Sequence, residues 1–256
     1  MTKIEKYRKE AEQGNAEAQF QLGLYYYYED DNEDYEQASE WFRKAAEQGH
    51  ANAQYKLGSY YDDLEGVEEG CTISVDVFRK AEPDYPQAIE WYSKAAEQGH
   101  VQAQMRLAYF YENGELHELG IPEDEEKAAY WYQKAAEQGN AEAQCKLANF
   151  YHNGIGVQED DTQAADWYHK AADLGYVEAF INLGYFYLDL SCDASQAGKD
   201  NNIALYWFEK AVKNGSNLSK ERIKELKEFI KELKADGYSS TNAKEIKELK
   251  ENGKSL

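Results

Sequence analysis

The sequence predicts an all-α protein built as a right-handed α-α superhelical solenoid of helix pairs with a C-terminal helical cap. Each tryptophan follows an alanine three residues earlier and precedes an aromatic residue, and these tryptophans are Trp41, Trp91, Trp131, Trp167 and Trp207. The phrase Ala-Ala-Glu-Gln-Gly recurs, at Ala45–Gly49, Ala95–Gly99, Ala135–Gly139 and, loosely, Ala171–Gly175. Apolar residues between these landmarks follow the period of an α-helix. A repeat of this length buries its apolar face only against neighbouring repeats, which favours a solenoid.

The clearest unit runs from Gly139 to Gly175. Asn140 follows a helix-ending glycine and is a good N-cap for a helix near Ala141–Asn153. One face of that helix carries small and apolar residues, namely Ala143, Leu147, Ala148, Phe150 and Tyr151. Gly154-Ile155-Gly156-Val157 forms a turn, and Asp160 or Asp161 can cap a second helix. That helix carries an apolar stripe of Ala164, Trp167, Tyr168 and Ala171.

The same template fits the rest of residues 1–215 as a half-unit followed by five helix pairs. The half-unit is Tyr7–Gly14. The other first helices share an alanine, a leucine, a small residue and a tyrosine, at Ala18, Leu22, Gly23 and Tyr26, Ala53, Leu57, Gly58 and Tyr61, Ala103, Leu107, Ala108 and Tyr111, and Ala179, Leu183, Gly184 and Tyr187. The small residue after the leucine predicts close approach of a neighbouring helix.

Two segments depart from the template. The insert Asp62–Pro86 includes residues 71–78, which alternate like a strand but have no evident partner, so we interpret them as an irregular loop. Residues 216–256 are rich in lysine and glutamate, and a short final helix would carry Ile246 and Leu249. We interpret this segment as capping helices that cover the last repeat. The alternative is a dimerisation helix, in an otherwise monomeric protein, through Ile223, Leu226, Ile230 and Leu233.

The pattern A-x-x-G-x-x-x-A-x-x-x-L-G-x-x-Y-x-x-G-x-G-V-(acidic)-A-x-x-W-(Y/F)-x-K-A resembles the Sel1-like repeat family, which is related to the tetratricopeptide repeats. The resemblance covers about Tyr7 to Gly215. It implies adaptor or scaffold work through protein binding, and it implies that the first helices line the concave surface. Some secreted members of the family have been linked to β-lactam hydrolysis, but this chain lacks their regular cysteine pairs.

Charge and cysteine content narrow the possible partners and the compartment. The net charge is −21, and residues 216–256 are near neutral, so the repeats carry the negative charge. Such a field disfavours nucleic acid and membrane surfaces and favours a basic protein partner. The three cysteines form neither a disulfide framework nor a zinc motif. The sequence has no export signal, which predicts a cytoplasmic protein.

The residue patterns indicate no active site, metal site or cofactor. Cys145 and His152 lie seven residues apart on one helix, beyond the reach of a nucleophile–base pair. His50 and His100 stand in the N-cap position of a repeat. The acidic run at 30–34 lacks the glycine and the glutamate of an EF-hand, which excludes that calcium motif. We therefore expect a non-catalytic protein.

Tyrosine is abundant, with 22 residues, and predicts a binding groove. Positions two before, two after, and five or six after the leucine of each first helix should face it, with Cys145, Ile181 and Leu188 at equivalent places. The candidate groove residues are Phe20, Leu24, Tyr27, Tyr28, Tyr55, Ser59, Asp62, Asp63, Met105, Tyr109, Glu112, Asn113, Asn149, His152, Asn153, Tyr185 and Asp189. Aromatic rings beside carboxylates suit a cationic protein partner. Some of these side chains could instead seal gaps between repeats.

The leading hypothesis is a non-catalytic protein–protein interaction scaffold or adaptor with an acidic, tyrosine-lined groove. A narrower version is an immunity or inhibitor protein that neutralises a basic toxin by electrostatic complementarity. A β-lactam-acting enzyme is the second alternative, and it rests only on the family resemblance.

Overall fold

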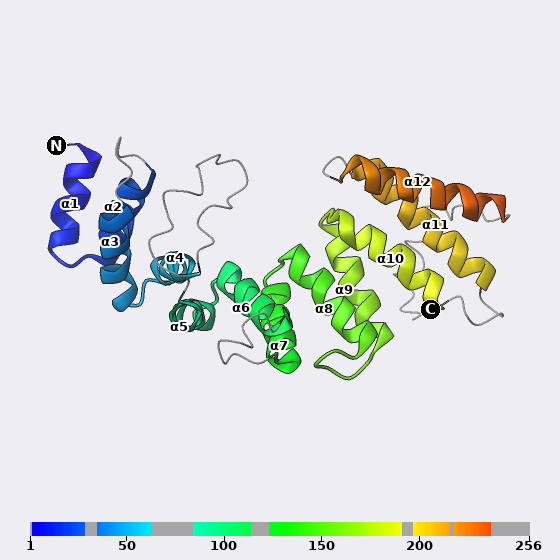
Figure 1. Cartoon of the computed structure of the whole chain (residues 1–256), viewed down its shortest axis with the longest axis horizontal. Coiled ribbons are helices and arrows are strands. Elements are labelled where there is room, and N and C mark those ends of the chain that lie inside the picture. The colour runs from blue at the N-terminus through cyan, green and yellow to red at the C-terminus, as the bar shows by residue number, and fades with distance from the viewer. Residues whose placement is uncertain are drawn as a thin grey trace. The chain divides into compact units, whose positions relative to one another are not determined.

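The computed structural model describes residues 2–28, 35–62, 84–113, 123–190, 197–215 and 218–236, and these residues form twelve helices and no strand (Figure 1). Their bounds are α1 Lys3–Glu12, α2 Ala16–Tyr28, α3 Tyr35–Glu47, α4 Ala51–Tyr61, α5 Tyr85–Glu97, α6 Val101–Asn113, α7 Glu125–Glu137, α8 Ala141–Asn153, α9 Asp161–Asp173, α10 Val177–Leu190, α11 Ala197–Asn214 and α12 Lys220–Ala235. The insert at 71–78 and the tail that holds Ile246 and Leu249 lie outside the described residues.

The chain divides into two compact units, Met1–Ala135 and Ala136–Leu256. Helices that follow one another in the sequence pack together within each unit, from α1 to α6 in the first and from α8 to α12 in the second. This is the all-α solenoid that the repeat period predicts.

Each repeat turn is built in the same way, as the one after α3 shows. Gly49 has φ +88°, a conformation that favours glycine. It lets the Gly49 and His50 amides donate to the Ala46 and Ala45 carbonyls, at 2.9 and 3.1 Å. The His50 side chain then accepts from the Ala53 amide and caps α4. In the clearest unit, Asn140 caps α8 and Asp160 caps α9, which confirms those helix starts.

A chain of side-chain amides, which we call the amide relay, ties successive helices to the turns. In the second repeat, Gln54 of α4 donates to the Ala46 carbonyl at the end of α3, at 3.0 Å. Gln98, the residue before the glycine at the end of α5, donates to Gln54 Oε1 at 2.6 Å. Gln48 and Gln19 make the same pair one repeat earlier, also at 2.6 Å. The recurring glutamines therefore satisfy helix-end carbonyls that would otherwise be buried unpaired.

The close helix approach predicted after each leucine is confirmed where that residue is glycine. A Cβ atom built on Gly58 would lie 2.7 Å from the Tyr92 ring of α5. One built on Gly184 would lie 2.5 Å from the Phe208 ring of α11. A side chain at either position would push the paired helices apart.

In three repeats, the lysine three residues after the tryptophan lies over the tryptophan ring. Lys44, Lys94 and Lys170 place Nζ 3.9, 3.9 and 3.6 Å from the ring centroids of the tryptophans that precede them. The lysine thus lies over a tryptophan ring that is half-buried at Trp41 and Trp167 and buried at Trp91.

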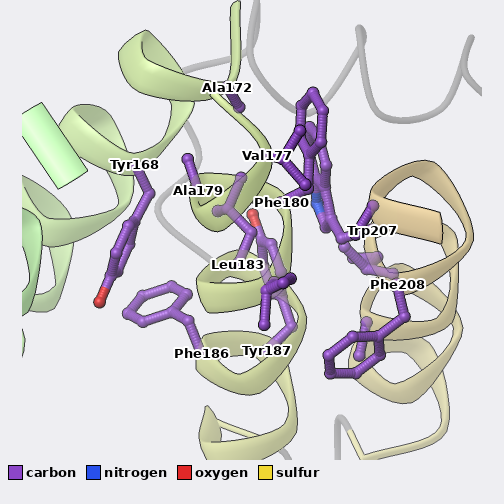
Figure 2. Close-up of a cluster of buried hydrophobic side chains, with 14 of the residues drawn as sticks. Tyr168, Ala172, Val177, Ala179, Phe180, Leu183, Phe186, Tyr187, Trp207 and Phe208 are labelled. Atoms are coloured by element: carbon purple, nitrogen blue, oxygen red, sulfur yellow. The ribbon is translucent and has the colours of Figure 1, made fainter. Parts of the chain in front are cut away.

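The second unit has one apolar core that reaches from α8 to α12. Figure 2 shows Phe180 of α10 beside Trp207 of α11, whose ring centroids lie 5.9 Å apart. Leu226, Ile230 and Leu233 of α12 belong to the same buried cluster. These side chains, named above as a possible dimer seam, are covered within the chain, and Ile223 alone of that seam lies outside the cluster.

Candidate functional site

A pocket of about 500 Å³ opens on the first helices of the second unit, and we call it the α8–α10 pocket. Its lining comes from α8, α9 and α10, and consists of Asn149, His152, Asn153, Tyr168, Asn182, Tyr185, Phe186 and Leu188. Four of the candidate groove residues therefore come together here, on two neighbouring helices. Among the described residues, no lysine, arginine, aspartate or glutamate lines this pocket.

Three asparagines connect the pocket wall by hydrogen bonds. Asn149 Oδ1 accepts from the Tyr168 hydroxyl, and it also accepts from Asn182 Nδ2 at 3.2 Å. Asn182 Nδ2 lies 3.3 Å from the sulfur of Cys145 as well. Asn153 Nδ2 donates to the Asn149 carbonyl, one helical turn back, at 2.8 Å. These bonds fix the orientation of the carboxamides and join α8 to both α9 and α10.

Aromatic side chains form the apolar part of the wall. The Phe186 ring lies between Tyr168 and His152, with ring centroids 5.7 and 5.2 Å away, and Figure 2 shows it beside Tyr168. Tyr185 is 45% exposed, although its ring packs edge-on against Phe208 at 5.1 Å. An exposed aromatic ring with a packed base is a typical anchor for a binding partner.

The cysteine and tyrosine at the pocket stay protonated at neutral pH, which suits binding better than nucleophilic catalysis. Burial raises the pKa of the Cys145 thiol to about 12, so the group stays protonated at neutral pH. Burial likewise raises the pKa of Tyr168 above its ordinary value. His152 Nδ1 lies 2.7 Å from Asp161 Oδ1, a contact that orients the imidazole. Within the described ranges, no three histidine, cysteine or acidic side chains are placed to hold a metal ion.

In the first unit, two candidate groove residues are buried in a helix junction. Asp62 is 4% exposed and accepts from Arg106 at 2.6 and 3.2 Å, while the Tyr92 hydroxyl donates to it at 3.0 Å. The same hydroxyl lies 3.3 Å from Ser59, which is also buried. Burial raises the pKa of Tyr92, so this hydroxyl remains a donor. Asp62 and Ser59 therefore join α4, α5 and α6, and offer little surface to a partner.

Of the other candidate groove residues in the first unit, some pack against neighbouring side chains and others are exposed. Phe20 and Tyr55 stack on the capping imidazoles of His50 and His100, with centroids 4.7 and 4.6 Å apart. Glu112 accepts from the Tyr132 hydroxyl at 2.5 Å. Leu24, Tyr27 and Met105 are half-buried, whereas Tyr28, Tyr109 and Asn113 are exposed. Asp63 and the side chain of Asp189 lie outside the described residues.

The candidate set omitted the position just before each leucine, which carries Lys56, Arg106 and Asn182. Lys56 Nζ lies 3.3 Å from the Tyr28 hydroxyl, and Asn182 lines the α8–α10 pocket. Helical spacing could have identified this position, because it lies three residues before the one that carries Tyr109, Asn149 and Tyr185. Tyr168 was assigned to the apolar stripe of its helix and Phe186 was not among the candidates, yet both line the pocket.

A family model and the similar solved structures both point to the same repeat family. The Sel1 repeat matches residues 16–50, 51–69, 79–100, 101–140, 141–176 and 177–216. A protective antigen from uropathogenic Escherichia coli, with the same repeat fold, is 34% identical and superposes with a TM-score of 0.69 over 90% of this chain and 44% of its own. This chain therefore spans less than half of that protein. No curated protein matches the chain.

Two further solved structures are similar. A Sel1 repeat protein from Oxalobacter formigenes is 34% identical, with a TM-score of 0.56 over 81% of this chain and 75% of its own. The immunity protein Pa5087 from Pseudomonas aeruginosa is 20% identical, with a TM-score of 0.40 over 71% of this chain and 61% of its own. Among the described helices, none is long and apolar enough to cross a membrane.

Proposed function

Because the chain belongs to the Sel1 repeat family, we propose that it is a non-catalytic interaction scaffold that binds a segment of a partner protein in the α8–α10 pocket. The Sel1 repeats cover most of the chain, and the resemblance implies scaffold work through protein binding. The observation that carries the proposal is the pocket itself, which opens on the first-helix face and combines fixed carboxamides with an exposed tyrosine. Both kinds of group recognise polypeptide.

The carboxamides of the pocket complement a polypeptide main chain. Each offers donor and acceptor atoms like those of a peptide group. Their orientation is set before a partner arrives, by the bonds from Tyr168 and Asn182 to Asn149. A partner therefore meets a prepared surface, and less side-chain freedom is lost on binding. Tyr185 adds contact area at the rim.

The net charge of −21 supports a basic partner protein through long-range attraction. In this proposal the charge accelerates encounter, and the neutral pocket provides the contacts. Asp62 is already paired with Arg106, so carboxylates elsewhere on the repeats supply the field. Neutralisation of a basic toxin is a narrower form of the same proposal, and it rests on charge. The likeness to Pa5087 is too remote to add to it.

Affinity capture with paired variants tests the proposal. The full chain, Tyr185→Ala and Tyr109→Ala are each immobilised and exposed to lysate of the source organism at two salt concentrations. Tyr109 is the matched control because it holds the equivalent exposed position on α6. The proposal expects a basic protein that the wild type and Tyr109→Ala retain at low salt and that Tyr185→Ala loses. Equal retention by all three proteins, or retention of nothing, contradicts it.

A further inference from the structure

We propose that the α8–α10 pocket receives an arginine side chain of the partner. This inference rests on the proposed function, and it adds the chemical identity of the residue that anchors the partner. It follows from three features of the pocket, which are the orientation of its amides, the open ring of Tyr185 and the charge around it.

The carboxamides at the pocket are turned so that oxygen atoms remain available. Asn153 donates its Nδ2 to the main-chain carbonyl of Asn149, which can only accept. Its Oδ1 therefore faces away from that bond. Asn182 likewise uses Nδ2 toward Asn149 and Cys145. The oxygens Asn153 Oδ1 of α8 and Asn182 Oδ1 of α10 take no part in these bonds. A guanidinium group carries only N–H donors and therefore suits amide oxygens as acceptors.

Tyr185 supplies the second feature, a ring that no described lysine or arginine covers. Of the other exposed tyrosines, Tyr28, Tyr109 and Tyr130 each have a cation within 5.7 Å of the ring centroid, whereas Tyr60 has none among the described residues. The ring of Tyr185 packs against the rings of Phe208 and Phe229. An arginine from outside the chain can therefore occupy the place that an intramolecular cation takes at those tyrosines.

The surroundings favour a cation over a neutral group. Among the described residues, no lysine or arginine lines the pocket, and the Asp161 carboxylate lies behind the lining residue His152, 2.7 Å from its Nδ1. Leu188 and Phe186 give an apolar surface for the methylene stem. The planar, stackable guanidinium uses all of these features, whereas the compact ammonium of lysine does not.

The probe is a blocked arginine, N-acetyl-L-arginine N-methylamide, titrated into the ¹⁵N-labelled full chain and followed by NMR. The citrulline analogue has the same shape without the charge, and the lysine analogue has the charge without the plane. We expect resonances of Asn153, Asn182 and Tyr185 to shift with arginine, and binding of both analogues to be about tenfold weaker, as for a difference of about 1.4 kcal/mol. Absent shifts at the highest soluble concentration, or equal binding of citrulline, overturn the inference.

Two substitutions check the geometry. Asn153→Asp adds a carboxylate beside the expected guanidinium and should tighten arginine binding several-fold. The control is Asn113→Asp in α6, because Asn113 makes the same bond to the carbonyl four residues back, at 2.9 Å. Tightening by the control as well would show a nonspecific charge effect and reject the pocket. If Tyr185→Ala abolishes partner capture while the blocked arginine fails to bind, the proposed function survives and the arginine inference alone falls.

Discussion

Leu174 interrupts the amide relay at the end of α9, and replacing it should stabilise the second unit. It occupies the position that Gln98 holds at the end of α5, directly before the glycine of the repeat turn. Gln144 of α8 still donates to the Ala136 carbonyl at 3.1 Å. Its Oε1, however, is buried and has no partner among the described residues, and Leu174 is 58% exposed. Leu174→Gln would supply the missing donor.

The expected gain can be worked from these contacts. Relieving a buried, unpaired acceptor is worth about 1–3 kcal/mol. Leu174 is less than half buried, so its loss costs under about half of the roughly 1.5–3 kcal/mol of a fully buried leucine. The balance is a stabilisation of about 1 kcal/mol. For a chain of this length, that corresponds to a rise in Tm of about 2–4 °C.

The assay is urea unfolding of the full chain with hydrogen exchange of the α8 and α9 amides, because repeat arrays can unfold in parts. Leu174→Glu is the control, since glutamate has the same shape as glutamine but no N–H to donate. Gln98→Leu is the reverse change, and it should destabilise the first unit by leaving Gln54 Oε1 unpaired. If Leu174→Gln is no more stable than Leu174→Glu, the relay is not a source of stability and the reasoning is refuted.

Three further predictions concern buried polar groups. Asp62→Asn leaves the half-buried Arg106 without its carboxylate, so urea titration should show a free energy of unfolding lower by about 3 kcal/mol. A loss under about 1 kcal/mol would contradict a stabilising ion pair. Burial lowers the pKa of His100 below 6.5, so the unfolded chain binds protons more readily and the free energy of unfolding should fall as pH drops below about 6.5. His100→Asn keeps a capping residue and should flatten that slope, whereas an unchanged slope would exclude His100 as its source. Burial raises the pKa of the Cys145 thiol to about 12, so this thiol should resist iodoacetamide at pH 8 in the folded chain and react after unfolding. Peptide mass mapping measures the alkylation, and rapid alkylation of the native protein would contradict the burial of Cys145.

Local sequence signals were sufficient for the helices and turns. Asn140 and the glycines on either side define α8 at the bounds that the spacing predicts, because caps and chain breaks act within a few residues. The glycine after the leucine, as at Gly58 and Gly184, likewise indicated close packing, since only one helix pair is involved. These features depend on neighbours along the chain, which a sequence displays directly.

The site was less accessible to sequence reasoning, because it depends on contacts between repeats. Asp62 lies at a position that helical spacing assigns to the exposed groove, yet its carboxylate is buried in an ion pair with Arg106 of the next first helix, 44 residues later. Phe20 is packed by His50 of the following repeat. Conversely, Asn182 reaches the pocket because Asn149 of the preceding first helix holds its amide. Helical spacing identifies a face, but the partner across the gap decides whether a residue on that face is buried.

The central claim is that a partner protein binds in the α8–α10 pocket. Hydrogen–deuterium exchange of the full chain, alone and saturated with the captured partner, tests it most directly. The account predicts slower exchange in residues 149–153 and 182–188, with Tyr185→Ala removing the effect. Protection confined to the first unit or to α12, with residues 149–153 and 182–188 unchanged, would contradict it.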